Sequence, residues 1–455
     1  MTSPNTKSTG SSLEEWLGIF FGEAQSPRFF DASKGALLQP GVFSENLPAL
    51  AVGRRGGLSR LEAEALRKGW GAHRFAIVSG TAQKPLVVLP VSGRRIRPEA
   101  VKALRLYKAG TFRRRIGLWG TRFLNLFGAY SALFRNEMLV ISPPGGRDVF
   151  SFLSEIAGVK DNVAIAIYRG SRKWIVPLFS RGNVFGYAKI YDREAREYGE
   201  TEADTLEALS KSDLSGFAVP KVLSRADFGG RFVLLLSSRD PLKRSCGILP
   251  AHYEWLRTLS RETGQKAEFQ NAPFSKSFSS EIDFLKSKIP ERFPAIESAV
   301  REAEAALRGK AFVFSLTMRE FPYFQILRSP GGPFVIDWEE SRFGYPPAFD
   351  LFSLLLSAGK RSGGSYVALY ENNVENIFFR KNGKTANAFR ALLPAWGMSA
   401  EDAYYFFILF LVDQLYIHLH VGHTESAERI ISLFEKRARG EGPISPEKWL
   451  GGGGF

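Results

Sequence analysis

The acidic residues best suited to holding a metal ion occur close together in the last third of the sequence. Asp337 follows the apolar run 334–336 and precedes Trp338 and Glu339, and Asp350 comes after the pair Pro346-Pro347. A carboxylate at the end of a buried strand is held in a fixed position, which suits it to bind a hard cation such as Mg²⁺. An isolated Asp-Trp-Glu sequence is also compatible with an ordinary strand end.

A second pair of ionisable residues lies upstream. Lys189 is in the alternating run 186–190, which predicts a strand, and Glu202 is in a stretch rich in Glu and Ala that predicts a helix. A lysine that faces a protein core is costly unless it is paired, and a glutamate at this spacing would be a suitable partner. The alternatives are a solvent-facing Lys189 and an exposed Glu202.

This order of motifs resembles the aminoglycoside phosphotransferase and choline kinase family, over roughly residues 151–455. The resemblance implies a bilobal protein kinase-like fold of class α+β, in which a small antiparallel-sheet lobe precedes a mainly helical lobe. It also implies ATP and Mg²⁺ as cofactors, with Lys189 on the phosphates, Glu202 holding Lys189 and Asp337 binding metal. Asp350 would support the catalytic loop from beneath.

The candidate catalytic loop, Met318–Gln325, departs from that family. The family motif is His-Gly-Asp-x-x-x-x-Asn, and Met318, Arg319, Glu320 and Gln325 stand at its four defined positions. The match implies that Glu320 orients the acceptor and that Gln325 binds metal, each with one methylene more than the family residue. A displacement of about 1 Å can cost roughly a hundredfold in rate, so the loop is either active with altered geometry or inactive. Arg319 is expected either to neutralise Glu320 or to reach phosphate.

Two further segments are assigned by their order along the chain. Turn 169–173 would cover the phosphates, with backbone amides of Gly170 and Ser171 available to them, or would be a plain surface hairpin. The segment that contacts adenine would fall at 237–239, around Ser238.

The elements that must position these residues follow from hydrophobic periodicity. We expect strands at 74–78, 86–91, 163–168, 174–179, 184–191, 222–224 and 232–237, and a helix at about 193–211. From Pro250 onward the pattern is mostly helical, interrupted by a strand pair at 312–316 and 334–337. The cluster 143–146, Pro-Pro-Gly-Gly, predicts a linker. We therefore expect a disordered tail 1–12, a basic domain 13–146, a small lobe 151–240 and a helical lobe 241–455.

The positive charge is concentrated before residue 150. The chain of 455 residues has a formal net charge of +15, and residues 1–150 contain 22 Lys and Arg against 10 Asp and Glu. Within segment 94–134, basic residues alternate with Trp119, Phe123 and other apolar residues. This pattern is typical of a segment that associates with an anionic membrane surface, although a solvated face has the same charge. Nucleic-acid binding is the less favoured alternative, because only charge supports it.

The cellular compartment is predicted from the single cysteine, the N-terminal sequence and the length of the apolar runs. Cys246 is the one cysteine, which excludes an internal disulfide and fits a reducing compartment. No secretory signal is apparent, and the longest apolar run, 403–412, is short of the roughly 20 residues that span a bilayer. We expect a cytoplasmic protein, with possible peripheral association at the inner face of the membrane.

Two functions are therefore predicted. The first is an ATP- and Mg²⁺-dependent phosphotransferase that acts on a hydroxyl of a small molecule or saccharide. The basic segment joined to such a module is similar to bacterial proteins associated with surface-polysaccharide synthesis. The second is a pseudokinase that serves as a nucleotide-binding or scaffold protein.

Overall fold

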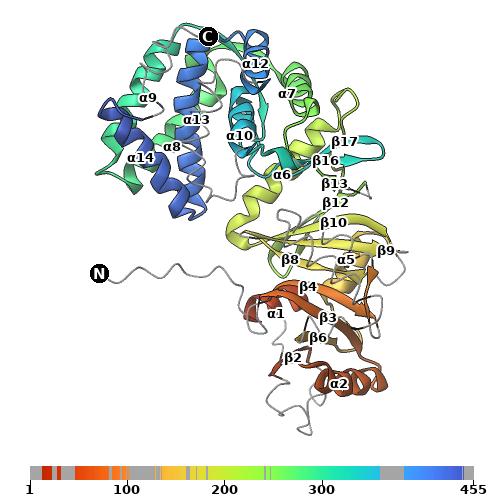
Figure 1. Cartoon of the computed structure of the whole chain (residues 1–455). Coiled ribbons are helices and arrows are strands. Elements are labelled where there is room, and N and C mark those ends of the chain that lie inside the picture. Colours follow the sequence, from red (N-terminus) through yellow and green to blue (C-terminus); the bar gives the residue numbers. More distant parts are fainter. Residues whose placement is uncertain are drawn as a thin grey trace. The chain divides into compact units, whose positions relative to one another are not determined.

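The computed structural model divides the chain into two compact units (Figure 1). The N-terminal unit comprises Met1–Glu207 and Pro220–Leu242, and the C-terminal unit comprises Ala208–Val219 and Lys243–Phe455. Within the described residues, no helix combines the length and apolar character needed to cross a membrane. The structure describes residues 13–22, 28–31, 47–80, 85–92, 95–98, 100–101, 125, 129, 134, 136–159, 164–170, 172–180, 183–239, 242–245, 247–358, 384–442 and 444.

A single mixed sheet runs through the N-terminal unit. Its main path is β1-β2-β6-β3-β4-β8-β9-β10-β12-β11, with β5 paired to β4 and β7 paired to β9. The β1–β2 pair is parallel, and the other pairs are antiparallel. The strands are β1 (Arg28–Asp31), β2 (Ala49–Gly53), β3 (Gly71–Gly80), β4 (Pro85–Ser92), β5 (Arg95–Ile96), β6 (Glu137–Ser142), β7 (Ala164–Ile165), β8 (Ile167–Arg169), β9 (Lys173–Ser180), β10 (Asn183–Tyr191), β11 (Val222–Phe228) and β12 (Arg231–Ser237).

The core of this unit contains residues from both ends of the sheet. Helix α1 (Leu13–Phe21) contributes Trp16 and Phe20, and α5 (Val149–Ile156) contributes Phe150; all three side chains are buried. They form one cluster with Val140 of β6 and Leu235 of β12. Helix α2 (Arg55–Arg67) covers a smaller cluster beside β2 and β6. The strands on either side of residue 146 therefore share one sheet and one core.

The helix that follows β10 is α6 (Arg196–Leu209), preceded by the 3-10 turn η4 (Arg193–Ala195). Gly199 allows α6 to pack closely on the sheet. A Cβ atom at Gly199 would lie 2.5 Å from Phe232 and 2.6 Å from Tyr191, well inside van der Waals contact. A larger residue there would separate the helix from β10 and β12.

The C-terminal unit is mainly helical. It contains two three-stranded sheets, β13-β16-β17 and β14-β15-β18, and helices α8, α9, α13 and α14 pack together (Figure 1). Its strands are β13 (Lys243–Arg244), β14 (Gln265–Glu268), β15 (Ala311–Thr317), β16 (Ile326–Ser329), β17 (Gly332–Val335) and β18 (Arg342–Tyr345). Its helices are α7 (Pro250–Thr263), η5 (Phe269–Asn271), α8 (Pro273–Lys288), α9 (Phe293–Leu307), η6 (Tyr323–Gln325), α10 (Ala348–Ala358), α12 (Lys384–Arg390), η9 (Leu393–Trp396), α13 (Ala400–His420) and α14 (Thr424–Ala438).

The predicted fold class is confirmed: an antiparallel-rich sheet unit is joined to a mainly helical one. The strands predicted at 312–316 and 334–337 correspond to β15 and β17, but they do not pair with each other, because they belong to different sheets. The domain bounds 13–146, 151–240 and 241–455 stay a prediction. Most of segment 94–134 and the whole of 1–12 lie outside the described residues.

Candidate functional site

The predicted lysine and glutamate contact each other inside the N-terminal unit. Lys189 Nζ lies 2.6 Å and 2.7 Å from the two carboxylate oxygens of Glu202. Glu202 is fully buried and Lys189 is 8% exposed, which excludes the solvent-facing alternatives for both. A buried carboxylate is stabilised only when its oxygens are bonded. The hydroxyl of Tyr191, on the same strand face, supplies a third bond by donating to Glu202 Oε2 at 2.6 Å.

The turn between β8 and β9 is closed by its own hydrogen bond. The Gly170 N–H donates to the Lys173 carbonyl at 2.8 Å, so a phosphate contact by this amide would have to replace that bond. Ser171 lies outside the described residues. Ser238 follows β12, where its N–H donates to the Phe185 carbonyl at 3.3 Å and its buried Oγ has no partner within the described part of the chain.

Asp337 occupies a strained backbone position directly beyond β17. Its φ is +77°, in the left-handed region that non-glycine residues rarely adopt, and such strain is often found at functional sites. The indole of Trp338, fully buried, donates to the Val335 carbonyl at 3.3 Å. The strand end and the buried tryptophan together hold Asp337 in place.

Gln325 is brought beside this strand end. The Ile336 N–H donates to the Gln325 backbone carbonyl at 3.2 Å, and β16 pairs with β17 directly after Gln325. The side-chain Oε1 of Gln325 is buried and has no hydrogen-bond partner among the described residues. A buried amide oxygen without a partner is unfavourable, and a bound cation would satisfy it. Asp337 and Gln325 are the residues here that could hold Mg²⁺, an ion that is usually bound by one or two carboxylates together with phosphates and water.

The first residues of the candidate catalytic loop differ in accessibility. Met318 and Arg319 are buried, whereas Glu320 is half-buried, and its N–H donates to the Met318 carbonyl at 2.7 Å. Arg319 has φ +61°, a conformation that glycine adopts freely, and it stands where the resembled motif has glycine. The Asp350 carboxylate accepts the Met318 N–H at 2.9 Å from beneath the loop.

The sequence left open whether Arg319 neutralises Glu320 or reaches phosphate, and its guanidinium is instead bonded to two other carboxylates. Its guanidinium is buried against Asp413 of α13 and Glu281 of α8, at 2.8 Å and 2.6 Å. Burial raises the pKa of Glu281 to about 8 and also raises the pKa of Asp413. The main cause is desolvation, because burial disfavours the charged form of a carboxyl group; the Arg319 guanidinium acts in the opposite direction at both groups, and the charge of Asp413 raises the pKa of Glu281 further.

Burial also affects Asp350. It raises the pKa of this carboxyl to about 7, with the hydrogen bonds from the backbone of Met318 and Arg319 acting in the opposite direction. Within the described residues there is no cluster of three or more His, Cys, Asp or Glu that could hold a metal by itself.

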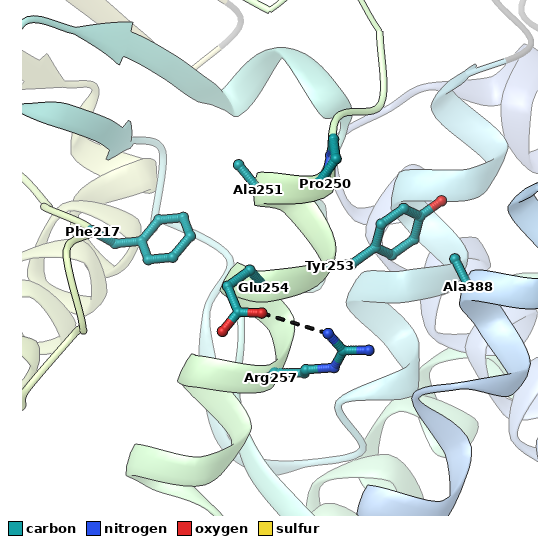
Figure 2. A pocket seen from close by; sticks show the side chains of 7 residues that line it. All are labelled: Phe217, Pro250, Ala251, Tyr253, Glu254, Arg257 and Ala388. Atoms are coloured by element: carbon teal, nitrogen blue, oxygen red, sulfur yellow. Dashed lines mark hydrogen bonds and ion pairs between the residues drawn. The ribbon is translucent and has the colours of Figure 1, made fainter.

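A separate surface pocket lies at the start of α7 (Figure 2). It has a volume of about 520 Å³ and is lined by residues that include Phe217, Tyr253 and Ala388, with Glu254 and Arg257 3.5 Å apart at its wall. None of the residues predicted from the sequence to form the site lines it. It therefore adds nothing to the site described above.

Comparison with known proteins gives structural neighbours only. No protein-family model matches the sequence, and no curated protein matches it. One solved structure similar to the chain is a thermostable mutant of aminoglycoside phosphotransferase APH(4)-Ia, which is 14% identical, with 64% of this chain and 98% of that chain covered and a TM-score of 0.44. Another structure of such a mutant is a ternary complex with ADP and hygromycin B. It is 15% identical, with 64% of this chain and 98% of that chain covered and a TM-score of 0.44. A putative fructosamine-3-kinase from Haemophilus somnus is also similar. It is 14% identical, with 63% of this chain and 96% of that chain covered and a TM-score of 0.40.

Proposed function

We propose that this chain is an ATP- and Mg²⁺-dependent phosphotransferase that acts on a hydroxyl of a small molecule or saccharide. The observation that carries the proposal is the strained Asp337 next to Ile336, whose N–H binds Gln325, together with the buried Gln325 amide oxygen that has no hydrogen-bond partner among the described residues. Strain in the backbone and an unsatisfied acceptor both lower stability. A bound cation would use the Asp337 carboxylate and the Gln325 amide oxygen as ligands, which accounts for both features. Mg²⁺ held there would neutralise charge on the nucleotide phosphates.

The remaining residues have complementary roles. Lys189, oriented by Glu202, binds the α- and β-phosphates, and the backbone at Gly170 and Ser171 covers them. Ser238 lies in the segment assigned to adenine. Glu320 accepts the proton of the acceptor hydroxyl. The hydroxyl oxygen of the acceptor then bonds to the γ-phosphorus as the bond from that phosphorus to ADP breaks.

Binding of ATP with and without Mg²⁺ tests this function. The parent chain should bind ATP more tightly with Mg²⁺, and Asp337→Ala should abolish that difference, because the variant loses a metal ligand. The exposed Asp283 on α8 provides a matched control, Asp283→Ala, which should behave like the parent. A parent chain whose thermal unfolding does not respond to millimolar ATP and Mg²⁺ would exclude the enzyme.

The alternative is a pseudokinase that binds nucleotide or acts as a scaffold. It is favoured by the buried Met318 at the position of the family's histidine. Glu320→Gln separates the two functions: it should leave ATP binding intact and lower turnover by about 10²- to 10⁴-fold, the usual contribution of a general base. Glu320→Asp restores the shorter carboxylate of the family and should retain activity if only the side-chain length has changed. Turnover that is unaffected by Glu320→Gln would remove Glu320 from the mechanism.

We further propose that segment 94–134 brings the protein to anionic membrane surfaces, in keeping with a role in surface-polysaccharide synthesis. The support is its composition of basic and aromatic residues, since most of it lies outside the described residues. Binding to anionic vesicles should weaken with salt, because exposed charges are screened over about 10 Å at 0.1 M salt. Equal binding to neutral vesicles would contradict this proposal, and salt-sensitive binding to DNA alone would favour a nucleic-acid partner.

A further inference from the structure

The candidate catalytic loop is attached to one face of α10 by its backbone. Residues 350, 353 and 357 recur at helical spacing, so their side chains line the same face of the helix. Three N–H groups of the loop donate to them: Met318 to Asp350 Oδ2 (2.9 Å), Phe321 to Ser353 Oγ (2.8 Å) and Tyr323 to Ser357 Oγ (3.1 Å). These bonds fix the loop on both sides of Glu320.

A second helix, α13, holds the residue immediately before Glu320. Arg319 Nε donates to Asp413 Oδ1 at 2.8 Å, and Gln414 Nε2 donates to the Arg319 backbone carbonyl at 3.1 Å. Arg319 Nη2 also donates to Glu281 of α8 at 2.6 Å. Both the side chain and the backbone of Arg319 are therefore bound to the helices behind the loop.

Burying Arg319 with its two carboxylate partners, at a backbone conformation that suits glycine, lowers the stability of the folded chain. A buried ion cluster often stabilises a protein no more than apolar residues of similar size, and its partners must be desolvated. Glycine would adopt φ +61° without strain, whereas arginine does not. Stability alone therefore does not account for an arginine here, while an accurately placed loop does.

We propose that Arg319 is a positioning residue, which fixes the backbone before Glu320 to α13 and α8 so that the Glu320 carboxylate is presented at the acceptor. The inference rests on the proposed function, because it assigns Arg319 a role through Glu320. It explains how a loop without the family's histidine and glycine keeps a defined geometry.

Arg319→Lys tests the proposal because it keeps the positive charge but cannot donate to Asp413 and Glu281 through a planar fork. Three quantities are measured on the full chain. The first two, with Mg²⁺-ATP, are the ATP affinity and the rate at which ADP is formed with water as acceptor. Hydrogen exchange at the Met318 and Phe321 amides reports on the loop directly. The matched control is Arg301→Lys, an exposed arginine of α9 that pairs with Glu297 in the same unit.

We expect the affinity of Arg319→Lys for Mg²⁺-ATP to stay within about twofold of the parent's. Its loop amides should exchange faster. It should form ADP about 10- to 100-fold more slowly, because a displacement of about 1 Å can cost that much in rate. Unchanged amide exchange would overturn the attachment, and faster exchange with an unchanged rate would overturn the positioning role. A parent chain that releases no ADP would instead overturn the proposed function, and amide exchange would still decide whether Arg319 fixes the loop.

Discussion

The buried carboxyl group of Glu281 makes the stability of the C-terminal unit depend on pH. Burial raises the pKa of Glu281 from 4.5 to about 8, so the folded chain binds a proton that the unfolded chain releases. The resulting stability is fully present below pH 4.5 and is lost as the pH rises through about 8. Glu281→Gln keeps an acceptor for Arg319 but cannot ionise. We expect this variant to lose less unfolding free energy than the parent between pH 5 and 9.

The difference between parent and variant should amount to several kcal/mol, since one pKa unit corresponds to about 1.4 kcal/mol. Denaturant unfolding at both pH values measures it. Asp350, with a pKa near 7, also titrates in this range, but it is present in both proteins and cancels in the comparison. Glu297→Gln, at an exposed pair with Arg301, is the matched control and should follow the parent. Identical pH profiles for parent and Glu281→Gln would show that Glu281 is ionised in the folded chain throughout.

Single residues could be predicted where their partners lie within one local motif. Lys189 and Glu202 are 13 residues apart, on a strand and the next helix, so a resemblance that rests on a local order of motifs was enough to pair them. The partners of Arg319 lie 38 and 94 residues away, and no local pattern indicates them. Tyr191 was missed for a different reason: a tyrosine in an alternating strand gives no sign that its hydroxyl binds a carboxylate.

At the scale of elements, the position of α6 depends on Gly199. Alanine is the better helix former by about 1 kcal/mol, yet its Cβ would meet Tyr191 and Phe232 at distances that require movement. Overpacking a core costs about 1–3 kcal/mol, so Gly199→Ala should be destabilising overall. Because α6 carries Glu202, we also expect weaker Mg²⁺-ATP binding, measured by calorimetry.

A second substitution tests whether contact with Phe232 causes the destabilisation expected for Gly199→Ala. Phe232→Leu creates space beside Gly199, so the double variant should be more stable than the sum of the two single effects predicts. Thr201→Ala, a similar change on the same helix, should leave ATP affinity unchanged. Additive effects of Gly199→Ala and Phe232→Leu would show that contact with Phe232 is not what holds α6 in place.

Strands and helices with clear periodicity were predicted well, and their pairing was not. The expected strands at 174–179, 184–191 and 232–237 correspond to β9, β10 and β12. Alternation defines which face of a strand is apolar, but it does not identify the neighbour. For this reason the pairing of β4 with β8, which joins the N-terminal strands to the rest of the sheet, could not be predicted.

At the scale of the whole N-terminal unit, the shared core implies that the N-terminal region is required for the sheet around Lys189 to fold. Trp16 of α1 contacts Trp174 of β9 with ring centroids 4.6 Å apart, and both are fully buried. Arg231 Nη1 also donates to the Gly18 carbonyl at 3.3 Å. The sheet face opposite Lys189 is thus covered by an element from the start of the chain.

Three truncated chains test this requirement. A chain that begins at residue 47 loses α1, whose four buried side chains, Trp16, Ile19, Phe20 and Phe21, each contribute about 1.5–3 kcal/mol. Their sum is comparable with the roughly 5–15 kcal/mol that stabilises a whole domain, so the N-terminal unit should lose its near-ultraviolet dichroism and cooperative unfolding. A chain that begins at Leu13 keeps α1 and should behave like the parent. If residues 147–455 alone unfold cooperatively and bind Mg²⁺-ATP with the parent's affinity, the small lobe folds independently, because no cover from α1 would then be needed to keep Lys189 and Glu202 together.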